Sequence, residues 1–216
     1  MHFFRLLGFL LGLVFASVIV AEESGFPDVG KGEGFDKIVP PQPTQERDKV
    51  EVIEFFWYGC PHCYAFEPYI KEWETNLPEN VHFIKQPVIF SSKWASGARA
   101  YFVAEALGIT DRVHASIFDA IQKQRNPLDT EEKLGEFFAD HGVTQEEFEQ
   151  AYNSFIVATR MRQAESMPAR YGVTGVPAIV INGKYRSNGT LAKTYPGLIS
   201  VMNALIEQES KALEGL

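Results

Sequence analysis

The sequence predicts an α/β fold, in which helices cover a single β-sheet and a long helical segment is inserted between the two parts of the sheet domain. A helical pattern lies between two strand-like segments within residues 49–88, and a strand hairpin and a helix follow near the end of the chain. Between these parts, residues 91–162 carry apolar side chains at three-to-four spacing, which is typical of amphipathic helices. We therefore expect a sheet domain built from residues 48–90 and 163–216, with residues 91–162 as the insertion.

The N-terminal segment has the composition of a secretory signal peptide. Its first residues, MHFFR, carry one arginine, and Leu6–Ala21 is an uncharged apolar run that ends in small residues. We predict a signal peptide over residues 1–21 with cleavage after Ala21, and Ala16 is an alternative cleavage position. The apolar run is short for a membrane span, so an uncleaved anchor is the less favoured alternative. The mature protein is expected to be exported and soluble.

Residues 22–47 connect this segment to the first strong strand pattern. They are rich in glycine, proline and charged residues and have no apolar periodicity, which predicts a flexible lead-in. One short edge strand is expected around Phe35–Val39. The sequence leaves open whether this lead-in tethers the protein to a membrane.

The first part of the sheet domain is predicted as strand, helix, strand. Lys49–Trp57, KVEVIEFFW, is short, rich in β-branched and aromatic residues and apolar on both faces, as in a buried central strand. A helical pattern runs from about Pro61 to Asn76, and Pro61 suits the first turn of a helix because its missing N–H needs no partner there. Asn80–Val88 reads as the second strand.

The insertion and the last elements are also predicted from local patterns. Within residues 91–162, Thr130 and Thr144 precede acidic helical segments and are expected to cap them. Val176–Tyr185 returns to a strand pattern, and Asn182–Gly183 predicts a type I′ hairpin turn. The segment from Tyr195 to Leu213 is an amphipathic helix.

Length and composition indicate a folded protein that does not act on nucleic acid. The chain has 216 residues, of which 45% are hydrophobic, and this is enough for one substantial core. Its formal net charge is −8, and no block of lysine and arginine interrupts that acidic balance. We therefore expect no nucleic-acid partner.

The only two cysteines, Cys60 and Cys63, lie two residues apart after the predicted central strand. A bridge between them closes a very small ring, so it adds little stability as a structural staple. A structural zinc site needs four ligands, and Tyr64 after Cys63 breaks the c-type haem pattern. A copper site would need a histidine that no spacing recommends. We therefore predict a redox-active pair and no metal.

The position of the pair assigns a different role to each sulfur. Cys60 is predicted at the N-terminus of a helix, where unpaired N–H groups and the helix dipole favour a thiolate. Cys63 lies one turn in and should resolve a mixed disulfide formed at Cys60. The dipole alone lowers the pKa of a thiol by less than one unit, so we expect a positive charge on His62 to supply most of a large shift. Alternatively, His62 is an exposed residue without effect.

A stabilised thiolate favours the reduced form of the pair and makes the disulfide a stronger oxidant. The chemistry of Cys60 and His62 is therefore expected to lean towards oxidation of other thiols.

Glu54 is a carboxylate in the middle of the predicted apolar strand. A buried charge there must be paired or protonated, and Lys85 on the second strand is the expected partner. Two interpretations stay open, a structural ion pair and a relay for the proton of Cys63.

Val176–Pro177 stands where the chain enters the predicted hairpin. A proline cannot donate to a strand ladder, so it belongs at a strand start or in a special turn. A cis-proline loop beside the cysteines would offer a backbone edge to an extended substrate, whereas an ordinary trans strand-start proline would not.

Four segments together resemble the thiol:disulfide interchange proteins of the DsbA family. These are EFFWYGCPHCYAFEPY, LPENVHFIK, AYNSFIV and TGVPAIVINGKY. They occur in family order, and the similarity runs from about Val50 to the C-terminal helix. The resemblance implies a thioredoxin-like fold with an inserted α-helical subdomain, and oxidation of newly exported proteins in the periplasm.

The resemblance also implies roles for particular residues. The family's motifs fall on these positions: nucleophile Cys60, N-terminal helix proline Pro61, thiolate-stabilising His62, resolving Cys63, cis-proline Pro177 after Val176, and buried acid and lysine Glu54 and Lys85. The implied partners are unfolded exported proteins with free thiols and a membrane reoxidase of the DsbB type. No cofactor is implied beyond the redox-active disulfide, because quinone acts only through the membrane partner.

These observations lead to one functional hypothesis and three alternatives. The hypothesis is a periplasmic dithiol oxidase that introduces disulfides through Cys60 and Cys63. A reductase or isomerase of the same fold is the first alternative, but such isomerases usually need a dimerisation domain, and residues 22–47 are too irregular for one. We therefore expect a monomer. A peptide-binding chaperone and a copper carrier are the non-enzymatic alternatives.

Overall fold

The computed structural model describes residues 33–215, so the predicted signal peptide and residues 22–32 of the lead-in lie outside the described residues. In chain order the elements are β1 (Asp36–Lys37), β2 (Val50–Phe56), α1 (Pro61–Glu74), β3 (Val81–Pro87), a short 3₁₀ helix (Ser92–Trp94), α2 (Ala95–Ala106), α3 (Thr110–Gln122), α4 (Glu131–Asp140), α5 (Gln145–Tyr152), α6 (Phe155–Arg170), β4 (Ala178–Ile181), β5 (Tyr185–Asn188) and α7 (Tyr195–Glu214). Over this part of the chain, no helix is both long enough and apolar enough to serve as a membrane span.

One mixed sheet of five strands, in the order β1-β5-β4-β2-β3, forms the frame of the molecule. β2 pairs in parallel with β3 and antiparallel with β4, and all seven of its residues are buried. This confirms the predicted central strand, whose apolar residues on both faces match a strand covered from two sides. The predicted edge strand is also present, because β1 pairs antiparallel with β5.

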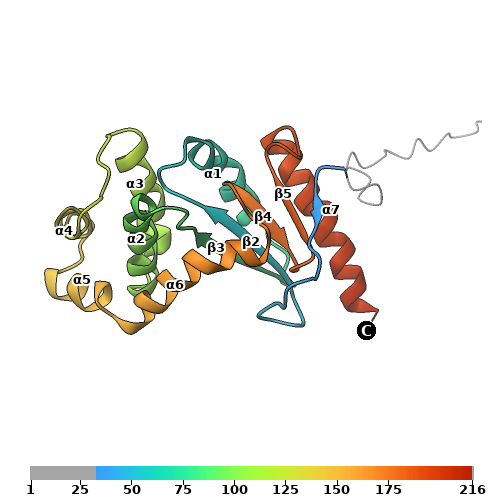
Figure 1. Cartoon of the computed structure of the whole chain (residues 1–216), viewed down its shortest axis with the longest axis horizontal. Helices are drawn as coiled ribbons and strands as arrows, with labels where there is room; N and C mark the ends of the chain where they lie inside the picture. The colour runs from blue at the N-terminus through green and yellow to red at the C-terminus, as the bar shows by residue number, and fades with distance from the viewer. Residues whose placement is uncertain (1–32, 216) are drawn as a thin grey trace, which may run out of the picture.

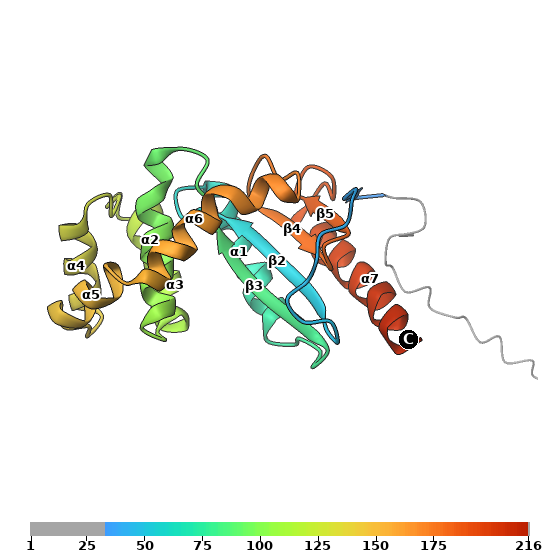
Figure 2. The same ribbon diagram turned by 60° about the horizontal axis from the view of Figure 1, so that its bottom comes forward.

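Helices cover both faces of the sheet. On one face, α1 and α7 pack side chains such as Phe66 and Leu205 against Val52 of β2. On the other face, the C-terminal part of α6 brings Met167 against Phe55 of β2 and its neighbours. Figure 2 shows α6 running from the helical end of the molecule across the sheet. The carboxyl end of β2 leads directly into α1, which belongs to the first of these two layers.

The inserted helices lie together at one end of the molecule, away from α7 (Figure 1). Thr130 and Thr144 accept hydrogen bonds from backbone N–H groups of the helices that follow them, which confirms both predicted caps. α6 runs on to Arg170, past the boundary expected at residue 162. It continues because its apolar face stays buried through Ala164 and Met167, first against the inserted helices and then against the sheet.

The predicted hairpin turn is present between β4 and β5. Asn182 and Gly183 both have positive φ, +50° and +63°, and the N–H of Lys184 donates to the carbonyl of Ile181 at 3.0 Å. Two central residues in the left-handed region define a type I′ turn. The antiparallel pairing of β4 with β2 sets Ala178 opposite Phe55, so the loop that precedes β4 lies next to the start of α1.

Candidate active site

The two cysteines lie at the start of α1, directly after the central strand. Cys60 is the N-cap residue, Pro61 is the first helical residue, and Cys63 lies in the first turn of the helix. Both cysteines are free thiols, so the structure describes the dithiol form. Cys60 is 8% exposed and Cys63 is fully buried. Cys60 is therefore the sulfur nearer to solvent.

The surroundings lower the pKa of Cys60 to about 6. The largest cause is a hydrogen bond from the thiol of Cys63, and backbone N–H groups of Cys63 and His62 and the charge of His62 lower it further. Burial acts in the opposite direction. A thiol in this setting is largely ionised at neutral pH.

The pKa of Cys63 is raised far above its usual range. Burial is the main cause, and the hydrogen bond to Cys60 and the charge of Cys60 add to it. Cys63 therefore keeps its proton, and its thiol donates a hydrogen bond to the Cys60 thiolate. This differs from the expectation that His62 supplies most of the shift, because a proton held on an adjacent buried sulfur acts at shorter range than an exposed imidazole.

The loop containing Val176 and Pro177 lies against the cysteines. The Val176–Pro177 peptide is cis, and the Sγ of Cys60 lies 3.5 Å from the carbonyl oxygen of Val176. A cavity of about 570 Å³ extends from this point between the start of α1 and the segment that precedes α7. Its lining includes His62, Tyr69, Val176, Pro177, Lys193 and Tyr195. The predicted substrate-binding residues thus share one groove with His62.

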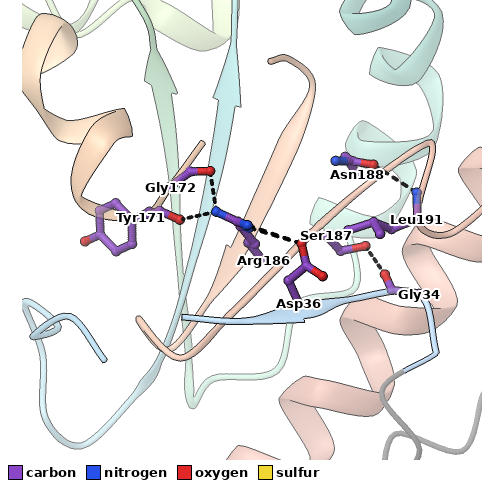
Figure 3. A network of polar contacts seen from close by, with 8 residues as sticks. All are labelled: Gly34, Asp36, Tyr171, Gly172, Arg186, Ser187, Asn188 and Leu191. Carbon is purple, nitrogen blue, oxygen red and sulfur yellow. Dashed lines mark hydrogen bonds and ion pairs between the residues drawn. The ribbon is translucent and has the colours of Figure 1, made fainter. Parts of the chain in front are cut away.

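A polar network joins this loop to the edge of the sheet (Figure 3). The guanidinium group of Arg186 on β5 donates to the carbonyl of Tyr171 at 3.4 Å, to the carbonyl of Gly172, and to the carboxylate of Asp36 at 3.3 Å. The hydroxyl of Ser187 donates to the carbonyl of Gly34 at 2.5 Å. The described part of the lead-in is therefore attached to β5 and, through Arg186, to the segment that leads into Val176–Pro177.

The structure does not form the predicted ion pair between Glu54 and Lys85. The two residues are register partners on β2 and β3, but the Nζ of Lys85 lies 2.6 Å from the carboxylate of Glu74. Glu54 is 1% exposed, and neither of its carboxylate oxygens has a hydrogen-bond partner among the residues that the structure describes. Lys85 pairs with Glu74 because that carboxylate is 42% exposed and keeps much of its hydration, whereas a charge on Glu54 would be buried.

Burial raises the pKa of Glu54 to about 8, and the negative charge of Glu67 adds to this more than Lys85 offsets it. Glu54 is therefore a protonated, neutral carboxyl group at neutral pH. It lies close enough to Cys63 for its charge to raise the pKa of that thiol. The sequence left two interpretations of Glu54 open. The ion pair with Lys85 is wrong, and the relay for the proton of Cys63 stays a prediction.

A buried hydrogen-bond chain that the sequence did not reveal links the insertion to the site. The hydroxyl of Tyr58 lies 2.7 Å from Nδ1 of His114 on α3, and Nε2 of His114 lies 3.0 Å from the carboxylate of Glu67 on α1. The side chain of Gln122 donates to the carbonyl of Tyr58 at 2.7 Å. α3 thus holds both Tyr58, two positions before Cys60, and α1, the helix that follows Cys60.

The chain through His114 is expected to contribute strongly to stability. A His114→Leu variant leaves the Tyr58 hydroxyl and the Glu67 carboxylate without their partner, and we expect a loss of about 2–3 kcal/mol in the free energy of unfolding. Urea titration of the reduced protein measures it. Addition of Tyr58→Phe should recover part of the loss, because one unpaired group is then removed. Additive losses would show that the chain contributes nothing beyond packing.

Within residues 33–215, no group of three or more histidine, cysteine, aspartate and glutamate side chains is arranged to hold a metal ion. The residues brought together around Cys60 are sulfur, imidazole, backbone carbonyl and aromatic groups. This set fits thiol–disulfide exchange, in which a thiolate attacks a sulfur and no other group is needed to carry electrons.

Comparison with known proteins agrees with this arrangement. Residues 89–197 match a family model described as a DSBA-like thioredoxin domain. The chain is 39% identical over 199 residues to the thiol:disulfide interchange protein DsbA of Azotobacter vinelandii, covering 92% of this chain and 93% of that protein. It is also 39% identical over 185 residues to the protein of the same name from Pseudomonas aeruginosa, covering 86% of this chain and 88% of that one.

Solved structures show the same fold. The crystal structure of Pseudomonas aeruginosa DsbA superposes with a TM-score of 0.81 at 39% identity and covers 85% of this chain and 95% of its own. The oxidoreductase DsbA from Xylella fastidiosa superposes with a TM-score of 0.76 at 30% identity, covering 82% and 96%. The thioredoxin-like fold with a helical insertion that the sequence resemblance implied is confirmed.

Proposed function

Because this chain belongs to the DsbA family and is a thiol:disulfide oxidoreductase, we propose that it works in the oxidising direction and that Cys60 and Cys63 carry the exchange. The observation that supports this most is the pairing of an ionised Cys60 with a buried, protonated Cys63. This arrangement stabilises the dithiol, so free energy is released when a substrate reduces the disulfide.

The reaction proceeds in two exchanges. A substrate thiolate attacks the Sγ of Cys60, the Cys60–Cys63 bond breaks, and the sulfur of Cys63 leaves with the electron pair and takes up a proton. A second thiolate of the substrate then attacks the substrate sulfur in the mixed disulfide and releases Cys60 as a thiolate. The substrate loses two electrons and forms a disulfide, and the protein gains two electrons as its dithiol.

The residues around the sulfurs have supporting roles in this scheme. His62 and the N-terminus of α1 stabilise the Cys60 thiolate that leaves in the second exchange. The groove beside Val176 and Pro177 receives an extended segment of the substrate. Glu54, neutral and buried near Cys63, is a candidate donor for the proton that Cys63 takes up.

Substrate proteins and a reoxidising partner follow from family membership. The substrates are unfolded exported proteins in the periplasm, and the partner is a membrane reoxidase of the DsbB type that passes the electrons to quinone. The protein itself acts as a monomer with no cofactor other than the disulfide between Cys60 and Cys63.

Alkylation of freshly extracted protein tests the direction of the reaction. Acid quenching of cells followed by modification of free thiols separates the dithiol from the disulfide by mass. The proposal expects mainly the disulfide, because the oxidant must be ready for the next substrate. Recovery mainly as the dithiol would instead support the reductase or isomerase alternative.

The acidity of Cys60 gives a second expected result. In the reduced protein, thiolate absorbance in the ultraviolet should rise with a midpoint near pH 6. Cys60→Ser should remove this transition. Cys63→Ala should move the midpoint upward, because the hydrogen bond from Cys63, the largest cause of the low pKa, is then lost. A wild-type midpoint near 9 would contradict the assignment.

A further inference from the structure

Tyr195, the first residue of α7, lies beside the active-site histidine. Its ring packs against Phe66 and Tyr69 of α1, with centroid distances of 5.5 and 5.6 Å. The hydroxyl of Thr194 caps the helix by accepting a hydrogen bond from the N–H of Gly197. The aromatic contacts and the cap fix the ring, so the position of its hydroxyl group is set before any substrate binds.

The hydroxyl of Tyr195 contacts two atoms of His62. It donates to the main-chain carbonyl of His62 at 3.1 Å and lies 3.5 Å from Nδ1 of the imidazole. A hydroxyl group has one hydrogen, and here the carbonyl accepts it. Only a lone pair of the oxygen is then left to face Nδ1, so this contact requires a proton on that nitrogen.

Among the described groups that line the groove, Tyr195 is the one that accepts a hydrogen bond from Nδ1 of His62. Among residues 33–215, the titratable side chains that line the groove are His62, Tyr69, Lys193 and Tyr195, and no carboxylate of this part of the chain lines it. The side-chain oxygen of Asn188 already accepts from the N–H groups of Thr190 and Leu191, at 2.9 Å each. Lys193 is a cation and disfavours a second positive charge nearby.

We propose that Tyr195 is a positioning residue for the exchange reaction, acting through His62. Its hydroxyl holds the imidazole at the mouth of the groove, close to Cys60, by accepting a hydrogen bond from an N–H at Nδ1, which the charged ring always carries. The charged ring stabilises the Cys60 thiolate, so Tyr195 contributes to the oxidising strength of the disulfide. This inference rests on the proposed role of Cys60 as the sulfur that exchanges with substrates.

A Tyr195→Phe variant removes the hydroxyl and keeps the ring packing. The loss of one partly exposed hydrogen bond to a charged group is expected to shift the equilibrium with glutathione about threefold towards the protein disulfide. The midpoint of the Cys60 thiolate titration should rise by about half a pH unit, which is the same factor of three. Both changes follow because the reduced form loses part of its stabilisation.

A double-mutant cycle separates this role from a structural one. Wild type, Tyr195→Phe, His62→Ala and the double variant are each equilibrated with glutathione and titrated for thiolate absorbance. We expect Tyr195→Phe to shift both readouts in the presence of His62 and to shift neither when His62 is absent. No shift in the wild-type background, or an equal shift in both backgrounds, would overturn the proposal.

Tyr185→Phe is the matched control. The hydroxyl of Tyr185 also holds α7, by accepting a hydrogen bond from Gln208 at 2.8 Å, whereas among the described residues the hydroxyl that hydrogen-bonds to His62 is that of Tyr195. This variant should leave the midpoint of the Cys60 titration unchanged. If Tyr185→Phe shifted it as much as Tyr195→Phe, the effect would belong to the docking of α7 and the proposal would fail. The titration needs no substrate, so this test can fail while the oxidase assignment holds.

Discussion

Cys63→Ser is expected to trap the protein in mixed disulfides with its substrates, whereas Cys60→Ser abolishes exchange altogether. Cys60 is the N-cap of α1 and the more accessible sulfur, so it is the one that bonds to a substrate. Cys63 is fully buried and can attack only a disulfide formed at Cys60. Without Cys63, a complex formed at Cys60 resolves only when a second substrate thiol reaches it.

Non-reducing electrophoresis of cells that express each variant measures this outcome. Cys63→Ser should give additional bands of high mass that disappear on reduction, and Cys60→Ser should give none. Disulfide formation in a reduced model substrate should fall by several orders of magnitude with Cys60→Ser. Mixed disulfides formed mainly by Cys60→Ser would reverse the assigned roles of the two sulfurs.

Glu54→Gln is expected to stabilise the protein at alkaline pH and to change its pH dependence. The pKa of Glu54 is raised to about 8 in the folded protein, chiefly by burial, whereas in an unfolded chain it is about 4.3. Between these two values the folded state binds more protons than the unfolded state. The free energy of unfolding contributed by this residue is therefore greatest below about pH 4.3 and declines as pH rises to about 8.

The size of the effect follows from the difference between the two pKa values, and it amounts to a few kcal/mol for a group that is 1% exposed. Glutamine keeps the volume of the side chain and cannot ionise. Above pH 8 the variant should therefore be more stable than wild type, and near pH 5 the two should differ little.

Urea unfolding of the reduced protein at pH 5, 6.5 and 8.5 measures the change. Glu72→Gln, at an exposed position on α1, is the matched control and should leave the pH dependence as it is. Glu51, whose pKa burial also raises, contributes a residual slope in every variant. If Glu54→Gln and wild type lost stability in parallel between pH 5 and 8.5, Glu54 would be charged in the folded protein.

The parts of the fold that the sequence predicted well are those encoded by local pattern. The strand of β2, the helix that Pro61 opens and the turn at Asn182–Gly183 depend on residues close in sequence, and the structure has all three. Cys60 and Cys63 could be placed at the helix N-terminus for the same reason, since strand, turn and helix follow one another directly.

Contacts between distant segments could not be predicted in this way. His114 is 56 residues from Tyr58, and Tyr195 is 133 residues from His62. A histidine in an amphipathic helix and a tyrosine at a helix start carry no local signal of the group that they meet. The only sequence signal for Tyr195 was its place at the start of the last helix, which packs beside α1 only in the folded sheet domain.

The charged residues show a different limit. Sequence spacing placed Lys85 opposite Glu54, and the strand register agrees. The choice of partner depended instead on the relative cost of ionising two carboxylates, one buried and one half-exposed. That cost is set by burial, which the sequence does not specify for Glu74 on the neighbouring helix.

Equilibration of the purified protein with mixtures of reduced and oxidised glutathione tests the central claim most directly. The fraction of dithiol is measured by alkylation at each ratio, and the equilibrium constant gives the reduction potential relative to glutathione. A low pKa at Cys60 and a buried, protonated Cys63 predict that the protein disulfide oxidises glutathione and lies clearly on the oxidising side of that couple. A potential on the reducing side of glutathione, close to that of a thioredoxin at about −270 mV, would contradict the account.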